Sequence, residues 1–277
     1  MAIRGSRAWT TVPPQAEGNQ VFYNKVQVFN RDLSTAIISQ FAAERAEEQA
    51  ERHARRLAKY NEKIAAGEDG FEPTAPRGLR IMEALSATGL RSIRYYNEIT
   101  PQVDQVVAND LKPEAAEAIR INVVRNGLDP ESQVIPSCGD ANIVMMQAAA
   151  AGEHYDVVDL DPYGSAAPFL NATMMSVADG GLLAVTCTDM AVLAGARPET
   201  CFSKYGSMPL HKRFCHEGGV RILLASLERA ASLHKKYIEP LLSCSIDFYS
   251  RVFVRVHTSA AESKRSALRL SQLYACG

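Results

Sequence analysis

From residue 79 onwards, short apolar runs alternate with segments of helical periodicity. Five runs predict strands: 79–85, 103–108, 133–136, 155–160 and 181–187. Helices are predicted over 112–126 and over 219–231. The runs 246–249 and 252–257 predict a terminal pair of strands. Strands that alternate with helices are typical of parallel βαβ units, so the pattern predicts an α/β protein with a doubly wound, mostly parallel sheet.

A strongly polar segment precedes this pattern. Residues 42–63 contain five acidic and six basic side chains, with favourable i,i+4 pairs at Glu48–Arg52 and Glu51–Arg55 and an unfavourable one at Glu44–Glu48. The segment predicts a long exposed helix that ends before the glycines and prolines of 67–76. A solvated insertion is the favoured interpretation, and an RNA-binding helix is the alternative.

The composition is that of an ordinary folded protein. The 277 residues are 47% hydrophobic and 22% charged, which excludes a disordered, collagen-like or disulfide-scaffold chain. No stretch approaches the roughly 20 apolar residues of a membrane helix. The six cysteines form no CxxC pair, so we expect reduced thiols in an intracellular protein. The N-terminus lacks a secretory signal; a flexible end is favoured there over a weak mitochondrial presequence.

The net charge of −1 hides an asymmetry along the chain. Residues 197–277 carry 13 basic and 6 acidic side chains, whereas residues 1–196 carry 17 basic and 25 acidic ones. A basic C-terminal third suits a surface that meets a polyanion. An uneven but merely solvated surface explains the same numbers, so charge alone leaves both interpretations open.

Polar residues follow the predicted strands, where α/β sheets bind their ligands. The turn 86–89 is neither a GxGxxG fingerprint nor a phosphate-binding loop, which argues against a plain dinucleotide site and an NTPase. Asp110 is placed to accept hydrogen bonds from two ribose hydroxyls, and Asp140 to accept one from an adenine amino group. Each acid alone could be a helix cap or a turn residue, but two at successive strand ends favour a nucleoside pocket.

Asp161-Pro162-Tyr163-Gly164 follows the strand 155–160. It combines a carboxylate, a carbonyl and an aromatic ring, a set that suits an exocyclic amine on a planar base. Two acceptors on the amine hydrogens localise its lone pair, and the carboxylate can take the released proton. The ring of Tyr163 can stack on the base. A plain β-turn fits the same four residues, so the motif alone does not decide. The spacing of His211, Cys215 and His216 matches no usual zinc pattern.

Several segments together resemble one family, the S-adenosylmethionine-dependent tRNA (guanine-26 N2)-dimethyltransferases. The matching segments are 21–34, 84–94, 107–110, 140–142, 159–164, 204–210, 240–249 and 251–255. They cover most of the chain in the family's order, which makes the match far more specific than any single motif.

The resemblance implies a class I methyltransferase fold with a seven-stranded sheet that ends in an antiparallel strand. It implies cofactor contacts at Arg31 and Arg91 (the methionine carboxylate or the shape of its pocket), at Asp110 (the ribose), and at Asp140 and Ala141 (the adenine). Asp161 is then the catalytic carboxylate, with the Pro162 carbonyl and Tyr163 completing the amine site. The implied reaction moves the sulfonium methyl to the N2 amine of guanine 26, once or twice, on a base that leaves its stack.

The resemblance also implies tRNA as the partner and an organisation of the chain. Residues 1–20 are expected to be a flexible N-terminus, and 21–257 a methyltransferase domain with a eukaryotic-like charged insertion and linker at 42–78. Residues 258–277 are expected to begin a tRNA-binding region that looks truncated, with Cys276 as a candidate first thiol of a metal site. The nucleus, the cytoplasm and the mitochondrion are the expected compartments. Two other functions remain open: a non-catalytic RNA-binding paralogue, and an amino-methyltransferase with another target.

Overall fold

The computed structural model describes residues 2–4, 9–11, 27–99 and 102–274. A seven-stranded sheet forms its centre, and its strands lie in the order β5-β4-β3-β6-β7-β9-β8. They span β3 (Leu79–Glu83), β4 (Val103–Asp110), β5 (Val134–Cys138), β6 (Tyr155–Leu160), β7 (Val177–Cys187), β8 (Lys236–Ile246) and β9 (Tyr249–Thr258). Strand β9 runs antiparallel to both of its neighbours, and the other neighbouring strands are parallel. The predicted doubly wound sheet is therefore confirmed.

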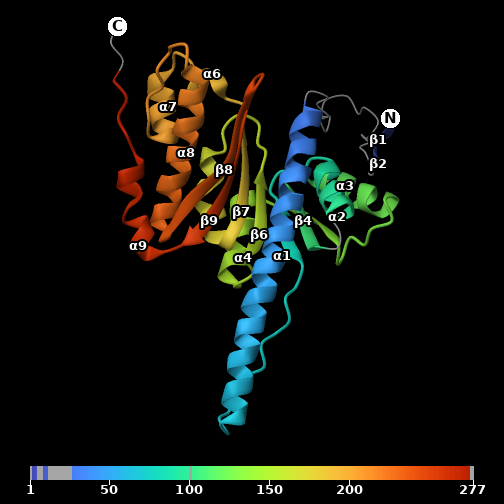
Figure 1. The fold of residues 1–277 in the computed structure, drawn as a ribbon. Coiled ribbons are helices and arrows are strands. Elements are labelled where there is room, and N and C mark those ends of the chain that lie inside the picture. Colours follow the sequence, from blue (N-terminus) through green and yellow to red (C-terminus); the bar gives the residue numbers. More distant parts are fainter. Residues whose placement is uncertain (1, 5–8, 12–26, 100–101, 275–277) are drawn as a thin grey trace.

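Helices cover both faces of this sheet (Figure 1). The helices of eight or more residues are α1 (Val28–Ala65), α2 (Leu90–Glu98), α3 (Pro113–Arg125), α4 (Ala141–Ala150), α7 (Pro198–Tyr205) and α8 (Cys215–Leu233). Shorter ones are η2 (Ala167–Phe169), α5 (Leu170–Ser176), α6 (Met190–Leu193), α9 (Ala260–Ser263) and η3 (Ser266–Arg269). A separate hairpin pairs β1 (Ala2–Arg4) with β2 (Trp9–Thr11).

Two apolar cores lie on opposite faces of the sheet. One joins the sheet to α1, α2 and α3, through residues such as Ile38, Ile93 and Ile119. The other joins it to α4, α5 and α8, through residues such as Met145, Met174 and Leu227. The central strand β6 is buried at every position, as expected for a parallel strand covered on both faces. Burial on both sides fixes the ends of the central strands, which carry the candidate site.

The terminal strands differ from the prediction over 246–249. Ile246 ends β8 and Tyr249 begins β9, and the two residues between them form a turn, with Asp247 at a φ of 46°. The sequence did not reveal β8 because β8 is the edge strand of the sheet. Its residues are largely exposed and include Glu239 and Pro240, so the apolar run typical of a strand is absent.

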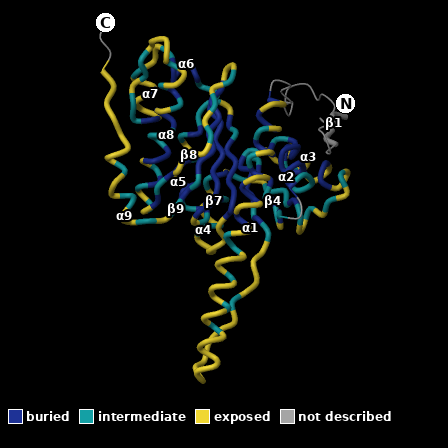
Figure 2. The backbone as a smooth tube through the Cα atoms, viewed as in Figure 1, coloured by how far each residue is buried: buried dark blue, intermediate teal, exposed yellow. Residues whose placement is uncertain are grey.

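The charged helix also differs from its prediction. It begins at Val28, well before residue 42, and its first turns pack on the sheet. Within the charged segment, Arg45 is buried and contacts Asp156, and Glu48 pairs with Arg255 through two hydrogen bonds of 2.8 and 2.9 Å. Beyond this point the helix projects from the body and is exposed (Figure 2), so the exposure predicted for 42–63 holds only for the later part of that segment.

The remaining predictions about the chain meet the structure in part. No helix among the described residues combines the length and apolar composition that a membrane span requires. The five cysteines in the described part are free thiols, and Cys276 lies outside it. Most of the predicted N-terminal segment 1–20 also lies outside it.

Candidate active site

The candidate site lies where β3, β4 and β6 end side by side. In the register of the sheet, Glu83 of β3 is opposite Asp159 of β6 and opposite Ala108 of β4. Asp161 follows β6 directly, and Asp110 is the last residue of β4. The parallel register therefore brings acidic side chains together at the carboxyl ends of three neighbouring strands.

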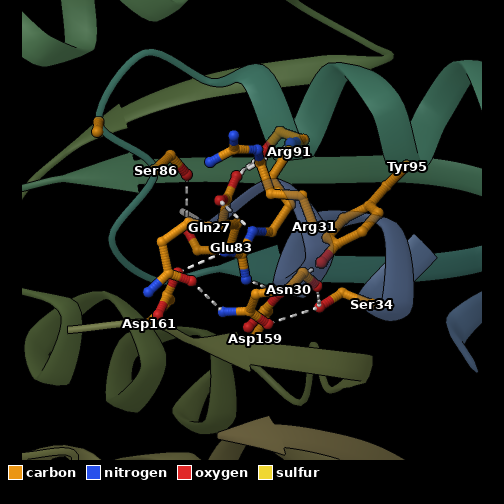
Figure 3. Close-up of polar contacts among 12 residues, drawn as sticks. Gln27, Asn30, Arg31, Ser34, Glu83, Ser86, Arg91, Tyr95, Asp159 and Asp161 are labelled. Carbon is orange, nitrogen blue, oxygen red and sulfur yellow. Dashed lines mark hydrogen bonds and ion pairs between the residues drawn. The ribbon is translucent and has the colours of Figure 1, made fainter. Parts of the chain in front are cut away.

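Arg91, in the first turn of α2, connects these acids. Its guanidinium contacts Asp161, lies 3.1 Å from Asp159 Oδ2 and lies 3.7 Å from Glu83 Oε1 (Figure 3). The side chain is 5% exposed, whereas that of Asp161 is 20% exposed. Burial opposes the charge of Arg91, but Asp161 and Asp159 outweigh it and raise the pKa of Arg91. Arg91 thus binds one oxygen of the Asp161 carboxylate.

Asp159 is the buried counterpart of Asp161. Its oxygens accept hydrogen bonds from Arg251 Nη1 at 2.8 Å and from the Tyr95 hydroxyl, in addition to Arg91. Burial alone raises a carboxyl pKa, but Arg251 and Arg91 outweigh it and hold the pKa of Asp159 well below its usual range. Asp159 is therefore a charged anchor for Arg91 and not a proton acceptor near neutral pH.

The first two turns of α1 close the site from the other side. Arg251 Nη2 donates to Ser34 Oγ at 2.8 Å, and Ser34 Oγ donates to the Asn30 carbonyl at 2.6 Å. Arg31 lies in the same cluster and is 8% exposed (Figure 3). The helix that the sequence suggested as an insertion thus begins as a wall of the candidate site.

Glu83 is buried beside Arg91 and accepts hydrogen bonds from the Ser92 hydroxyl and, at 3.0 Å, from the Ser92 backbone N–H. Burial raises the pKa of Glu83 to about 7, although the charge of Arg91 opposes the shift. Glu83 is the acid of this cluster whose charge changes near neutral pH.

The turn between β3 and α2 approaches Asp110. The Ala87 N–H donates to Asp110 Oδ2 at 2.9 Å, and the Lys112 N–H donates to Oδ1 at 3.1 Å. Ala87 and Gly89 have φ values of 51° and 74°, and a Cβ at Gly89 would lie 3.0 Å from Ile119. Each Asp110 oxygen keeps a lone pair for a further donor.

Asp140 caps α4 through a hydrogen bond of 2.8 Å from the Asn142 N–H, so the cap role open to it in the sequence is real. Ala141, the first residue of that helix, is buried. Leu111, directly after Asp110, is 68% exposed, which leaves an apolar side chain beside the two acids.

Pro162 is buried, and Tyr163 is 84% exposed. Partial burial of the Tyr163 hydroxyl raises its pKa, and the negative charges of Asp110 and Asp161 raise it further. The exposed ring therefore lies close to both carboxylates. The predicted site residues thus lie at the strand ends or in the first turns of α1, α2 and α4.

Sequence reasoning assigned no role to Asp159, Glu83, Tyr95 or Arg251. Tyr95 and Arg251 are 64 and 92 residues from Asp159 in the sequence, yet both donate hydrogen bonds to it. Spacing along the sequence does not reveal such contacts. The available signal was charge in an apolar context: Asp159 interrupts a buried strand, and such a residue needs a buried partner.

A family model described as N2,N2-dimethylguanosine tRNA methyltransferase (TRM) matches residues 6–277. This chain belongs to that family. Relatives named tRNA (guanine(26)-N(2))-dimethyltransferase from Mus musculus and Drosophila melanogaster are 44% and 46% identical to it. The matches cover 98% and 94% of this chain but 46% of each relative, so the chain spans about half the length of the curated relatives it matches.

A solved structure shares the fold of this family member. The structure, described as a complex of Trm1 from Pyrococcus horikoshii with S-adenosyl-L-methionine, has a TM-score of 0.75 and 28% sequence identity. The match covers 96% of this chain and 64% of the archaeal one. The class I methyltransferase-like fold is thereby confirmed.

Proposed function

We propose that this chain is a methyl-transfer unit that acts on the exocyclic N2 amine of guanine 26 in tRNA, with S-adenosylmethionine as the methyl donor. The observation that carries the proposal is Asp161. It is a partly exposed carboxylate at the end of a buried central strand, oriented by Arg91 and followed by the Pro162 carbonyl and the exposed ring of Tyr163. The family and the names of the relatives support the substrate.

The side chains at the strand ends fit the cofactor. Asp110 has two oxygens with spare lone pairs for the ribose hydroxyls, and exposed Leu111 offers an apolar surface for the adenine. Asp140 and Ala141 lie at the start of α4, after β5. One Asp140 oxygen caps the helix, and the other can accept a hydrogen bond from the adenine amine. When bound there, S-adenosylmethionine supplies a methyl group on a positively charged sulfur.

Two arginines are candidates for the methionine carboxylate. Arg31 lies at the start of α1 within the cluster, and its planar guanidinium suits a carboxylate. Arg91 already contacts Asp159 and Asp161. These contacts favour a shared role for Arg91, in which it orients Asp161 and adds positive charge beside the cofactor carboxylate.

Asp161 and the Pro162 carbonyl are the proposed acceptors for the amine hydrogens. Guanine N2 is a weak nucleophile because its lone pair is delocalised into the ring, and two acceptors on its hydrogens localise that lone pair. Asp161 takes the proton that the amine releases when its nitrogen accepts the methyl group, and the donor would lose its carbon–sulfur bond and leave as S-adenosylhomocysteine. The exposed ring of Tyr163 stacks on a base that has left its helix, and exposed basic residues of the C-terminal third hold the flanking phosphates.

The proposed organisation follows the sequence prediction. Residues 21–257 form the methyltransferase unit, with 42–78 as a charged arm and linker, and 258–277 lead towards a tRNA-binding region. Within the last segment, Arg269 pairs with Glu228 of α8 at 2.7 Å, so its start packs on the methyltransferase unit. An intracellular compartment, whether nucleus, cytoplasm or mitochondrion, is part of the same proposal.

The test is transfer of a labelled methyl group to tRNA that lacks modification at guanine 26, followed by digestion and identification of the nucleosides. The proposal predicts N2-methylguanosine or N2,N2-dimethylguanosine at that position. Methyl on another base nitrogen would favour a different amino-methyltransferase. Binding of S-adenosylmethionine and tRNA without any product would favour a non-catalytic paralogue.

A further inference from the structure

A chain of hydrogen bonds joins the loop after Asp161 to helix α7. Tyr205, the last residue of α7, is 1% exposed, and its hydroxyl lies 2.8 Å from Asp189 Oδ1 and 2.6 Å from Ser165 Oγ. A carboxylate only accepts, so Tyr205 donates to Asp189 and accepts from Ser165. The chain continues at both ends: the Ala167 N–H donates to Ser165 Oγ, and Lys204 Nζ lies 3.1 Å from Asp189 Oδ2.

A second connection holds the same loop to the end of β7. The Gly164 N–H donates to Thr188 Oγ1 at 2.7 Å, and the Thr188 N–H donates to the Gly164 carbonyl at 2.8 Å. Gly164 has a φ of 80°, a conformation that a glycine adopts without strain. The loop after Tyr163 is therefore held at two consecutive residues. Thr188, directly after β7, holds the Gly164 backbone, and Tyr205, 40 positions after Ser165, holds the Ser165 side chain.

These contacts hold the loop three and four residues after Asp161, which Arg91 contacts. Arg91 holds the Asp161 carboxylate, whereas Thr188 and Tyr205 hold Gly164 and Ser165. Pro162 and Tyr163 lie between the two fixed points. Hydrogen bonds in series strengthen one another in a buried setting, so the loss of one hydroxyl loosens the whole connection.

We propose that Tyr205, Asp189 and Thr188 are positioning residues, which fix the Pro162 carbonyl and the Tyr163 ring relative to Asp161. This inference rests on the proposed function, because it assigns these residues to the alignment of the target amine. Misplacement of reacting groups by about 1 Å costs roughly 100-fold in rate. The connection thus acts on turnover and not on cofactor binding, because the proposed cofactor residues Asp110, Asp140 and Ala141 lie after β4 and β5 and make none of these contacts.

The first test is Tyr205→Phe, which removes one oxygen and keeps the packed ring. The expected result is a fall in kcat of about tenfold or more, with S-adenosylmethionine affinity within twofold of wild type and a Tm lowered by no more than about 4 °C. Tyr155→Phe is the matched control, because Tyr155 is 3% exposed and lies at the opposite end of β6. Equal kcat values for Tyr205→Phe and wild type would overturn the inference, as would an equal loss in the control.

Amide hydrogen exchange gives a readout that does not depend on activity. In Tyr205→Phe, exchange over residues 163–167 is expected to quicken about tenfold, with α4 unchanged. Asp189→Ala is expected to act in the same way, whereas Asp189→Asn keeps an acceptor for Tyr205 and restores most of the protection. Unchanged exchange in Tyr205→Phe would overturn the positioning role even in an active enzyme. Faster exchange in a chain that transfers no methyl at all would instead place the failure in the proposed function.

Discussion

The acidic residues of the site divide into buried ones, such as Asp159, and the partly exposed Asp161. Asp159 and Arg251 are both fully buried and paired at 2.8 Å, so neither is exposed to a substrate. Asp161, two residues after Asp159, is partly exposed and shares the same arginine neighbour, Arg91. Identical side chains therefore have different roles because burial and pairing differ, which the sequence Asp-Leu-Asp does not show.

Glu83 makes stability depend on pH. Its pKa in the folded protein is about 7, above the ordinary value of 4.5, because burial outweighs the charge of Arg91. The folded state therefore binds this proton more tightly than the unfolded state. The stabilisation is fully present below pH 4.5 and is lost as pH rises through 7, by about 3 kcal/mol in total.

Urea unfolding of wild type and Glu83→Gln at pH values from about 5 to about 8 measures this effect. The glutamine variant keeps the shape of the side chain but has no proton to lose. The difference in the free energy of unfolding between variant and wild type is expected to move in favour of the variant as pH rises. A difference that is constant over this range would show that Glu83 does not titrate there.

The sequence predicted where the candidate site residues lie, but not which side chains they contact. Asp110, Asp140 and Asp161 follow apolar runs, and parallel strands bring such ends together. Arg251 reaches Ser34 across 217 residues of sequence and Tyr95 reaches Asp159 across 64. Such contacts depend on which strands are neighbours, and a local pattern carries no information about this.

At the scale of elements, α1 joins two different environments in one helix of 38 residues. Its first turns lie over the sheet and reach the site, and its second half projects into solvent. Arg45 and Glu48 mark the transition, since they pair with Asp156 and Arg255 of the sheet. Charge density predicted the exposed half correctly, but it concealed the packed residues within the same charged segment.

Arg45→Ala and Arg55→Ala test this division with the same substitution. Arg45 is buried and its loss removes one partner of buried Asp156, although Arg77 remains at 3.1 Å. Its replacement is expected to cost about 2–3 kcal/mol in the free energy of unfolding. Arg55 is 73% exposed and pairs only with exposed Glu51, so its replacement is expected to change stability by less than about 0.5 kcal/mol. Urea unfolding that gives equal losses would contradict a packed origin for the charged helix.

The whole molecule is polarised along the strand direction. The site lies at the end of the sheet where α1 begins, and the exposed arm of α1 projects from the other end (Figure 1). On the β7 side of the site, Arg197, Lys212 and Arg213 flank α7 and are exposed, and they form no ion pair within the described part of the chain. The arm carries Arg52, Arg56 and Lys59, which are exposed too, but it lies far from the chemistry.

Replacement of three charges at each place separates local phosphate binding from general attraction. The variant Arg197→Ala/Lys212→Ala/Arg213→Ala is expected to bind tRNA about tenfold more weakly. Its affinity should also depend less steeply on salt, with a slope shallower by about 0.7–0.9 for each phosphate that the variant no longer neutralises. The variant Arg52→Ala/Arg56→Ala/Lys59→Ala is expected to bind within about twofold of wild type. Fluorescence anisotropy at several salt concentrations measures both, and equal weakening in the two variants would contradict a tRNA surface beside the site.

The proposed reaction depends on Asp161 as the acceptor of the guanine amine proton. The most direct measurement is a single-turnover transfer of labelled methyl to tRNA by wild type and Asp161→Asn, with the product nucleoside identified and S-adenosylmethionine affinity measured in parallel. We expect methyl on N2 of guanine 26 in wild type, and a rate lower by about 100-fold or more in Asp161→Asn with cofactor affinity within a few-fold. A variant that transfers methyl at the wild-type rate would contradict it.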